Sequence, residues 1–326
     1  MNNLVDIAPK PQEQQEQQRP ARATLPVRWW VYQRERFPLV THVPLIAAFS
    51  FCTLSYSSLA RGQAQMPSAK AICVAFVTAL LFFLQLRISD EFKDAKDDAM
   101  YRPYRPVPRG LIALRELGIV AVAGALIQLA LALWLSPALL PLLLLVWGYL
   151  TLMSREFFVS RWLKAHPVVY MWSHMLILPL IDLYGTACDW RVAGVDAPPA
   201  LAFLLLVSFC NGFVVEIGRK IRAPQDEEYG VETYSALWGR RHATIVWLGM
   251  LGVTAIAALL AAAQIAFALP VGIPLALLLV AAGLVAARFL RTFGSHAAKG
   301  IETVSGLWTL LMYLGLGAAP LIWRLI

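Results

Sequence analysis

Acidic residues gather in two short stretches of this chain. Half of its 20 Asp and Glu residues lie either between positions 90 and 98 or between positions 216 and 232. They are Asp90, Glu91, Asp94, Asp97 and Asp98, followed by Glu216, Asp226, Glu227, Glu228 and Glu232. Carboxylates this close together repel one another, so each stretch needs positive charge nearby. The two stretches are therefore the first places to look for chemistry.

The spacing of the first stretch is typical of a metal site. Asp90, Asp94 and Asp98 are four residues apart, so on a helix they would lie along one face, advancing by roughly 40° per step over about 12 Å. Lys93 and Lys96 could neutralise them, in which case the stretch is an ordinary solvated helix end. The alternative is Mg²⁺, which prefers carboxylate and phosphate oxygens.

Three arginines follow these carboxylates and favour the metal-site interpretation. Arg102, Arg105 and Arg109 lie in a segment with three prolines, which forbid a regular helix and predict a stiff, extended loop. Guanidinium groups pair with phosphate oxygens two at a time. Carboxylates for a metal followed by arginines for phosphate therefore indicate a diphosphate site. For the arginines alone, anchoring of a cytosolic loop explains them equally well.

The elements that carry these residues are expected to be transmembrane helices. Apolar residues make up 59% of the sequence, charged residues 15%, and the mean hydropathy is +0.62. Several runs reach the roughly 20 residues that a helix needs to cross a bilayer. We expect an all-α polytopic protein with about nine spans, near residues 38–59, 70–88, 111–135, 138–153, 167–184, 199–216, 243–263, 267–288 and 302–323. Only Ser136 and Pro137 separate the third and fourth spans, so eight spans are the alternative.

The distribution of basic residues supports nine spans with a cytosolic N-terminus. That topology places all but four of the 28 Lys and Arg residues on the cytosolic side, as the positive-inside rule requires. The exceptions are Arg61, Lys70, Arg191 and Arg324. Both acidic stretches then lie on the cytosolic side of an inner or plasma membrane. Topology and the anionic leaflet explain the net charge of +8 without nucleic acid.

A polar region precedes the first span. Residues 11–20 lack apolar periodicity, so we expect residues 1–37 to be a disordered cytosolic tail that ends in an interfacial anchor. Residues 38–326 would form one transmembrane domain. The four cysteines are scattered without CxxC spacing and predict neither a disulfide framework nor a zinc site.

The first stretch resembles a signature of the UbiA superfamily of intramembrane prenyltransferases. That signature, (N/D)DxxDxxxD, closes the second helix and is followed by an RPxxxG-like element. Here Asp90, Glu91, Asp94 and Asp98 keep the spacing, with Glu91 in place of an aspartate, and Arg105–Gly110 (RPVPRG) follows. The nine-span architecture agrees with the family along nearly the whole chain after residue 37.

The second stretch is less similar to the family. The usual DxxxD signature, with a further acid, is represented by Glu216 as the first acid and Asp226 as a later one. Arg219 and Lys220 occupy the region where another acid is expected. A fixed cation such as Lys220 could replace part of the charge of a second metal ion.

The resemblance implies transfer of an isoprenoid chain from a prenyl diphosphate to an acceptor, which in this family is most often aromatic, by Mg²⁺-assisted ionisation to an allylic cation. It implies the catalytic residues Asp90, Asp94, Asp98, Glu216 and Asp226, of which the first four would bind the metal. It implies diphosphate binding by Arg102, Arg105, Arg109, Lys220 and Asn211. Its partners would be the two substrates and the bilayer, without an obligate protein partner.

Three other functions remain open. A membrane terpene cyclase on the same scaffold would capture the cation within its own chain. A transporter would need charged residues near the bilayer midplane, where the spans have almost none. A non-catalytic isoprenoid-binding member is suggested by Arg219 and Lys220. Asn211 could instead make a helix–helix hydrogen bond, and a lone buried histidine such as His174 is more often structural than catalytic.

Overall fold

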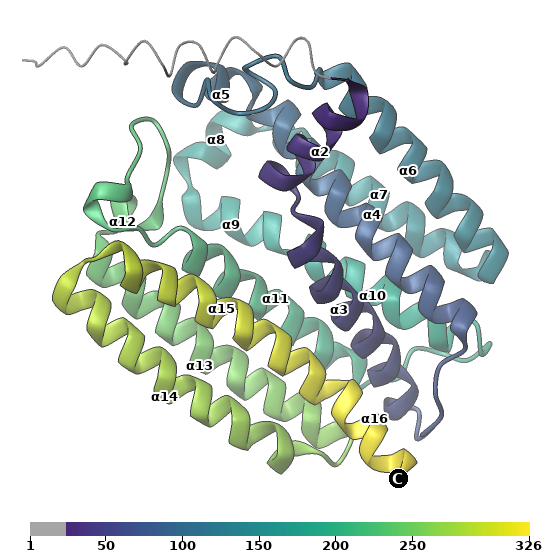
Figure 1. The fold of residues 1–326 in the computed structure, drawn as a ribbon. Coiled ribbons are helices and arrows are strands. Elements are labelled where there is room, and N and C mark those ends of the chain that lie inside the picture. Colours follow the sequence, from purple (N-terminus) through teal and green to yellow (C-terminus); the bar gives the residue numbers. More distant parts are fainter. Residues whose placement is uncertain (1–23) are drawn as a thin grey trace, which may run out of the picture.

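The computed structural model describes residues 24–326, and this part of the chain is a helical bundle without strands (Figure 1). Nine helical segments within it are long and apolar enough to cross a membrane, which confirms the predicted fold class. The spans are α3 (Leu39–Ala60), α4 (Ala69–Lys93), α6 (Leu114–Leu135), α7 (Leu140–Ser154) with η2 (Pro137–Leu139), α9 (Pro167–Met175) with α10 (Ile177–Trp190), α11 (Leu201–Arg219), α13 (Arg240–Gln264), α14 (Ala268–Thr292), and α15 (Ser295–Leu316) with α16 (Ala318–Leu325).

The break between the third and fourth spans is a real chain reversal. Helix α6 ends at Leu135, and Ser136 takes an extended conformation. The Ser136 hydroxyl accepts a hydrogen bond from the Ala138 backbone N–H at 3.3 Å, and Pro137 begins η2. A polar cap followed by proline is a strong start signal for a new helix. Nine spans, and not eight, are therefore formed.

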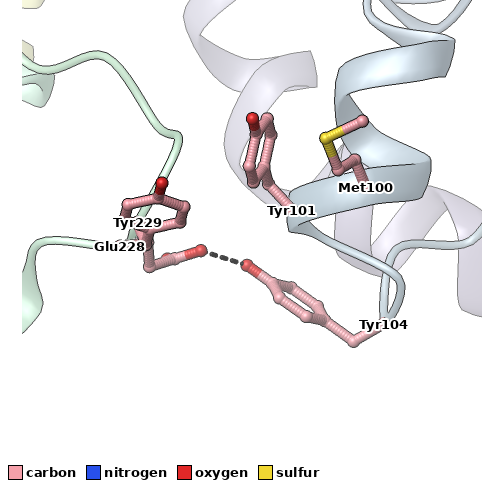
Figure 2. A pocket seen from close by; sticks show the side chains of 5 residues that line it. All are labelled: Met100, Tyr101, Tyr104, Glu228 and Tyr229. Atoms are coloured by element: carbon pink, nitrogen blue, oxygen red, sulfur yellow. Dashed lines mark hydrogen bonds between the residues drawn. The ribbon is translucent and has the colours of Figure 1, made fainter.

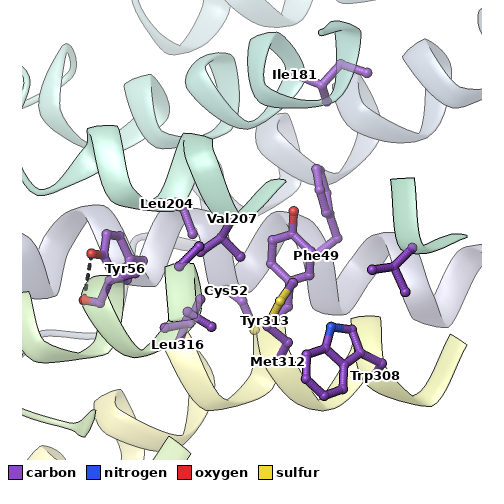
Figure 3. Packing of buried hydrophobic residues seen from close by; sticks show 14 of the residues in the cluster. Phe49, Cys52, Tyr56, Ile181, Leu204, Val207, Trp308, Met312, Tyr313 and Leu316 are labelled. Carbon is purple, nitrogen blue, oxygen red and sulfur yellow. Dashed lines mark hydrogen bonds between the residues drawn. The ribbon is translucent and has the colours of Figure 1, made fainter. Parts of the chain in front are cut away.

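The core lies where α3, α10, α11 and α15 meet (Figure 3). Phe49 and Tyr313 contact each other edge to face, with ring centroids 5.0 Å apart. Close helix approach is set by small residues, because a methyl group at Gly317 would lie 2.3 Å from the Cα atom of Cys52. The ninth span thus closes the bundle by packing on α3.

Among the described residues, the carboxylate of Asp182 is fully buried inside this core. Asp182 of α10 accepts hydrogen bonds from the Thr53 hydroxyl at 3.0 Å and from the Tyr313 hydroxyl at 2.8 Å. The two bonds join α10 to α3 and α15. Asp182 is an exception to our expectation of almost no charged residues within the spans, and its hydroxyl partners satisfy it there.

The segment expected to be an interfacial anchor is helical. Residues 25–36 form a helix, α2 (Leu25–Arg36), whereas the polar tract at residues 11–20 that we expect to be disordered lies outside the described part. Tyr32 is buried in a small apolar cluster with Ile112 and Leu117. The Arg28 side chain bonds Glu116 at 2.7 Å. Helix α2 therefore packs on the bundle, at the same end as α5 (Ala95–Tyr101) and α12 (Tyr234–Leu237) (Figure 1).

Candidate functional site

The first acidic stretch lies on two helices. Helix α4 ends at Lys93, Asp94 lies in the break, and α5 begins at Ala95. The three aspartates therefore do not lie on one continuous helix. Helical hydrogen bonds still cross the break, from the Asp94 N–H to the Asp90 carbonyl and from the Asp98 N–H to the Asp94 carbonyl, both at 2.8 Å. The three acids consequently remain about one turn apart.

Two of these three aspartates are already paired with cations. Asp98 is almost completely buried, and Arg105 donates to both of its carboxylate oxygens, at 3.0 and 2.8 Å, while Arg102 lies 2.6 Å away. Asp90 is more exposed, with Arg87 at 3.4 Å and Lys93 at 3.6 Å. Asp98 is thus neutralised, whereas the ion pairs of Asp90 are long and weak.

Asp94 is different, because its carboxylate has no ion-pair or side-chain hydrogen-bond partner among residues 24–326. It is half-buried, and this burial raises the pKa of the carboxyl group; Lys93 lowers that pKa, and the charges of Asp90 and Asp98 raise it. An ionised carboxylate in such surroundings gains most from an added cation. Asp94 is therefore the position in this stretch that best fits a metal ion.

The arginine segment is a series of turns, and the extended loop predicted from its prolines is wrong. The Arg105 N–H donates to the Arg102 carbonyl, and the Arg109 N–H donates to the Arg105 carbonyl, both at 3.0 Å. Gly110 closes the segment with a φ of +74°, a conformation that glycine adopts without strain. The turns bring Arg102 and Arg105 back over Asp98. Arg109 instead pairs with Glu35 of α2 at 2.7 Å.

The second acidic stretch is neutralised from within. Glu216, at the end of α11, has Arg219 at 2.6 Å and Lys220 at 2.8 Å. Asp226 lies exposed in a short turn, η4 (Pro224–Asp226). Glu227 stabilises the loop by accepting hydrogen bonds from the Thr233 and Ser235 hydroxyls. Glu216 and Glu227 thus pair with residues of the same segment.

The segment that follows the first stretch contacts the second stretch (Figure 2). The Tyr104 hydroxyl donates to Glu228 at 2.6 Å, and the rings of Tyr101 and Tyr229 lie edge to face at 5.8 Å. The Tyr104 hydrogen bond lowers the pKa of Glu228, and Arg222 adds to this effect. Together with Met100 these residues line an open cavity of about 570 Å³.

The donor set supports Mg²⁺ only in part. Among residues 24–326, no three His, Cys, Asp or Glu side chains converge on one point. Mg²⁺ needs only one or two protein carboxylates when substrate phosphates complete its shell. Asp90 and Asp94 satisfy that requirement, whereas Asp98 and Glu216 are held by their own cations.

Several polar residues inside the spans have structural partners. The Asn211 amide N–H donates to the Thr309 hydroxyl at 3.1 Å, and that hydroxyl lies 3.2 Å from the Asn211 amide oxygen. This is the helix–helix hydrogen bond that we gave as the alternative to substrate binding by Asn211. Gln128 bonds Gln85 and Trp147. The Nε2 atom of His174 is one of several buried polar side-chain atoms that have no partner in the described chain. The hydrogen bond from Lys93 to Tyr170 and the α2 contacts were not predicted from the sequence, since these partners are distant along the chain.

The chain belongs to the UbiA prenyltransferase family. A family model of that description matches residues 48–301, in agreement with the helical membrane fold and the acidic site at one end. No curated protein matches the chain.

Solved structures resemble the fold at low sequence identity. A digeranylgeranylglyceryl phosphate synthase is 14% identical, with a TM-score of 0.61 over 90% of this chain and 99% of its own. A UbiA homologue from Aeropyrum pernix K1 is 17% identical, with a TM-score of 0.61 over 86% of this chain and 98% of its own. A UbiA homologue from Archaeoglobus fulgidus, solved with DMAPP and Mg²⁺, is 12% identical, with a TM-score of 0.48 over 85% of this chain and 98% of its own.

Proposed function

We propose that this protein transfers an isoprenoid chain from a prenyl diphosphate to a small aromatic acceptor of the quinone-precursor type. The observation that carries the proposal is Asp94, a half-buried carboxylate that lacks a cation beside a cluster of arginines. A diphosphate substrate that binds together with a divalent cation would satisfy both features. The cation would pair with Asp94, and the phosphate oxygens would pair with the arginines. Membership of a prenyltransferase family agrees with this substrate class.

The residues have distinct roles in the proposal. Asp90 and Asp94 would hold Mg²⁺, which when bound withdraws charge from the diphosphate. Asp98 holds Arg102 and Arg105 in place, so that their free N–H groups are oriented before substrate arrives. Ligation of metal by Asp98 or Glu216, and substrate contacts of Asp226 and Asn211, remain predictions from the resemblance.

In the proposal, basic side chains favour ionisation by stabilising the negative charge that develops on the diphosphate. As the bond between C1 of the prenyl chain and the diphosphate oxygen breaks, both bonding electrons leave with the diphosphate. Arg102 and Arg105, with Lys220 from the second stretch, would stabilise that developing charge. Arg109 reaches the site only if it leaves Glu35. Capture of the allylic cation by the acceptor completes the transfer.

We also propose that the site faces the cytosol. The basic segments that flank it are those that the positive-inside rule assigns to the cytosolic side. Cysteines introduced singly at exposed Asp97 and at Val195, on the two ends of the bundle, should be labelled from opposite sides of sealed vesicles. Labelling from the same side would contradict the topology.

The function is tested with purified protein, Mg²⁺ and prenyl diphosphates of graded chain length, following diphosphate release and the products. Asp94→Asn should reduce turnover by roughly 100-fold or more, the loss expected when an important electrostatic group is removed from an active site. Asp97→Asn is the matched control, because Asp97 is exposed and, among residues 24–326, its ion-pair partner is Lys164 alone. Equal activity of the two variants would refute the site, and cyclic products would indicate a cyclase.

A further inference from the structure

His174 has a defined tautomer in this structure. Its Nδ1 atom lies 2.8 Å from the Tyr170 carbonyl oxygen, and a carbonyl can only accept, so Nδ1 must carry the proton. Ser173 lies 3.3 Å from Nδ1 but donates its own hydroxyl to the same carbonyl at 3.0 Å. In the neutral ring the lone pair is therefore on Nε2.

That lone pair has no partner. The His174 side chain is 8% exposed, and its Nε2 atom is buried without a hydrogen-bond donor anywhere in residues 24–326. Buried polar atoms are almost always hydrogen-bonded, so an orphaned one calls for an explanation. An incoming donor group on a ligand is the explanation that the surroundings support.

The surroundings connect His174 to the acidic site. Its ring stacks on Tyr170, with centroids 3.9 Å apart. The Tyr170 hydroxyl accepts a hydrogen bond from Lys93 at 2.7 Å, and Lys93 also pairs with Asp90 at 3.6 Å. Tyr170 and Lys93 thus link the His174 ring to Asp90 of the first acidic stretch, which we propose binds the metal and diphosphate.

The residues on another side of His174 include an aromatic ring on a strained turn. Phe157 lies edge-on to His174 at 6.2 Å and to Tyr149 at 5.6 Å. It belongs to η3 (Glu156–Phe158), whose three residues have φ values of 48°, 53° and 61°. Such left-handed conformations are costly for residues with side chains and cluster at functional sites. Because Nε2 is closed off here, movement of this turn would be the way to uncover it.

We propose that His174, Tyr170, Tyr149 and Phe157 form the acceptor subsite, which takes a phenolic ring and recognises its hydroxyl through Nε2. The inference rests on the proposed transferase function and specifies the acceptor. The hydroxyl proton passes to Nε2 as the ring carbon beside the hydroxyl bonds to C1 of the prenyl cation. The ring then regains aromaticity by moving its displaced proton to the oxygen, and His174 releases one proton to water. The diphosphate leaves with the electrons of the broken C1–O bond, so the reaction balances.

The test separates acceptor recognition from prenyl diphosphate binding. Binding of 4-hydroxybenzoate and of 4-methoxybenzoate, which lacks the donor hydroxyl, is measured on purified protein with and without farnesyl diphosphate. The unmodified protein should prefer the hydroxyl compound by about tenfold, as one hydrogen bond to a buried acceptor allows. His174→Ala and His174→Asn should abolish this preference and leave the affinity for farnesyl diphosphate within about twofold.

His166→Ala is the matched control, since His166 is exposed and stacks on Trp162. It should keep the hydroxyl preference. Asp94→Asn should also keep it while losing Mg²⁺-dependent farnesyl diphosphate binding, so failure of the proposed function appears in that variant alone. A preference that persists in both His174 variants, or that is missing from the unmodified protein, would overturn the subsite.

Discussion

The two acidic stretches differ in how their charge is balanced. In the first, Asp94 has no partner in the described chain and the ion pairs of Asp90 are long, at 3.4 and 3.6 Å. In the second, Arg219 and Lys220 stand three and four residues after Glu216 and neutralise it. Similar acidic composition thus produces a stretch that can accept a divalent ion and one that carries its own fixed cations. In the proposed function, the first stretch would therefore hold the metal ion.

The largest effect is expected at Asp98. Asp98→Ala should abolish turnover and also lower stability, because it leaves Arg102 and Arg105 without their shared, buried partner. Breaking a buried pair in this way costs about 3–5 kcal/mol. Thermal melting in detergent alongside the activity assay measures both effects. Glu216→Gln, whose partner Arg219 is half exposed, should cost less than about 1 kcal/mol. Equal destabilisation by the two variants would remove the contrast between the stretches.

A smaller effect is expected at the arginine segment. Arg105→Ala should weaken prenyl diphosphate binding by about 10- to 100-fold, the equivalent of one or two hydrogen bonds to a charged group. Acceptor binding should change little. Arg161→Ala provides the control, because Arg161 is exposed on the nearby α8 (Ser160–Ala165). If Arg105→Ala binds the diphosphate as tightly as the control, Arg105 does not contact it.

A smaller effect again is expected from the hydrogen bond between Tyr104 and Glu228. Tyr104→Phe removes the hydrogen bond to Glu228, worth about 0.5–1.5 kcal/mol at most at this exposed position. Hydrogen exchange in residues 226–231 should rise a few-fold, with a similar increase in KM. The pKa of Glu228 should return upward, so the loop should loosen at a higher pH on acidification than in the unmodified protein.

Tyr229→Phe is the control for this contact, because Tyr229 is exposed and its hydroxyl makes no hydrogen bond within the described residues. Exchange that is unchanged in Tyr104→Phe, or equally raised in Tyr229→Phe, would show that the hydrogen bond does not hold the loops together.

The subtlest effect is expected at Lys220. If this ammonium replaces part of a second metal's charge, Lys220→Asp should retain activity and add a second, weaker Mg²⁺ requirement. The reason is that a fixed cation and a bound divalent ion both neutralise phosphate oxygens, but only the ion gives a concentration-dependent rate. The reaction rate is measured as a function of the free Mg²⁺ concentration for the unmodified protein and for Lys220→Asp. Superimposable curves, or an inactive variant that still binds metal, would show that Lys220 is only an anchor.

The fold was predictable because lipid imposes simple rules. A span needs about 20 apolar residues whatever its neighbours are, and basic residues collect on one side. The nine spans follow from these local patterns. The packed α2 did not, since its mixture of aromatic and basic residues is equally typical of an interfacial anchor, and the burial of Tyr32 depends on Ile112 and Leu117, distant in the chain.

The residue types of the site were determined by the sequence, whereas tertiary structure decided which of them are free. Spacing identified Asp90, Asp94 and Asp98 together and gave them equal roles. The break at Asp94 and the turns that carry Arg105 back to Asp98 make these roles unequal, because ion pairing depends on distances across a fold. His174 shows the same limit. A pattern can place a histidine in a span, but only packing shows that its Nε2 lacks a partner.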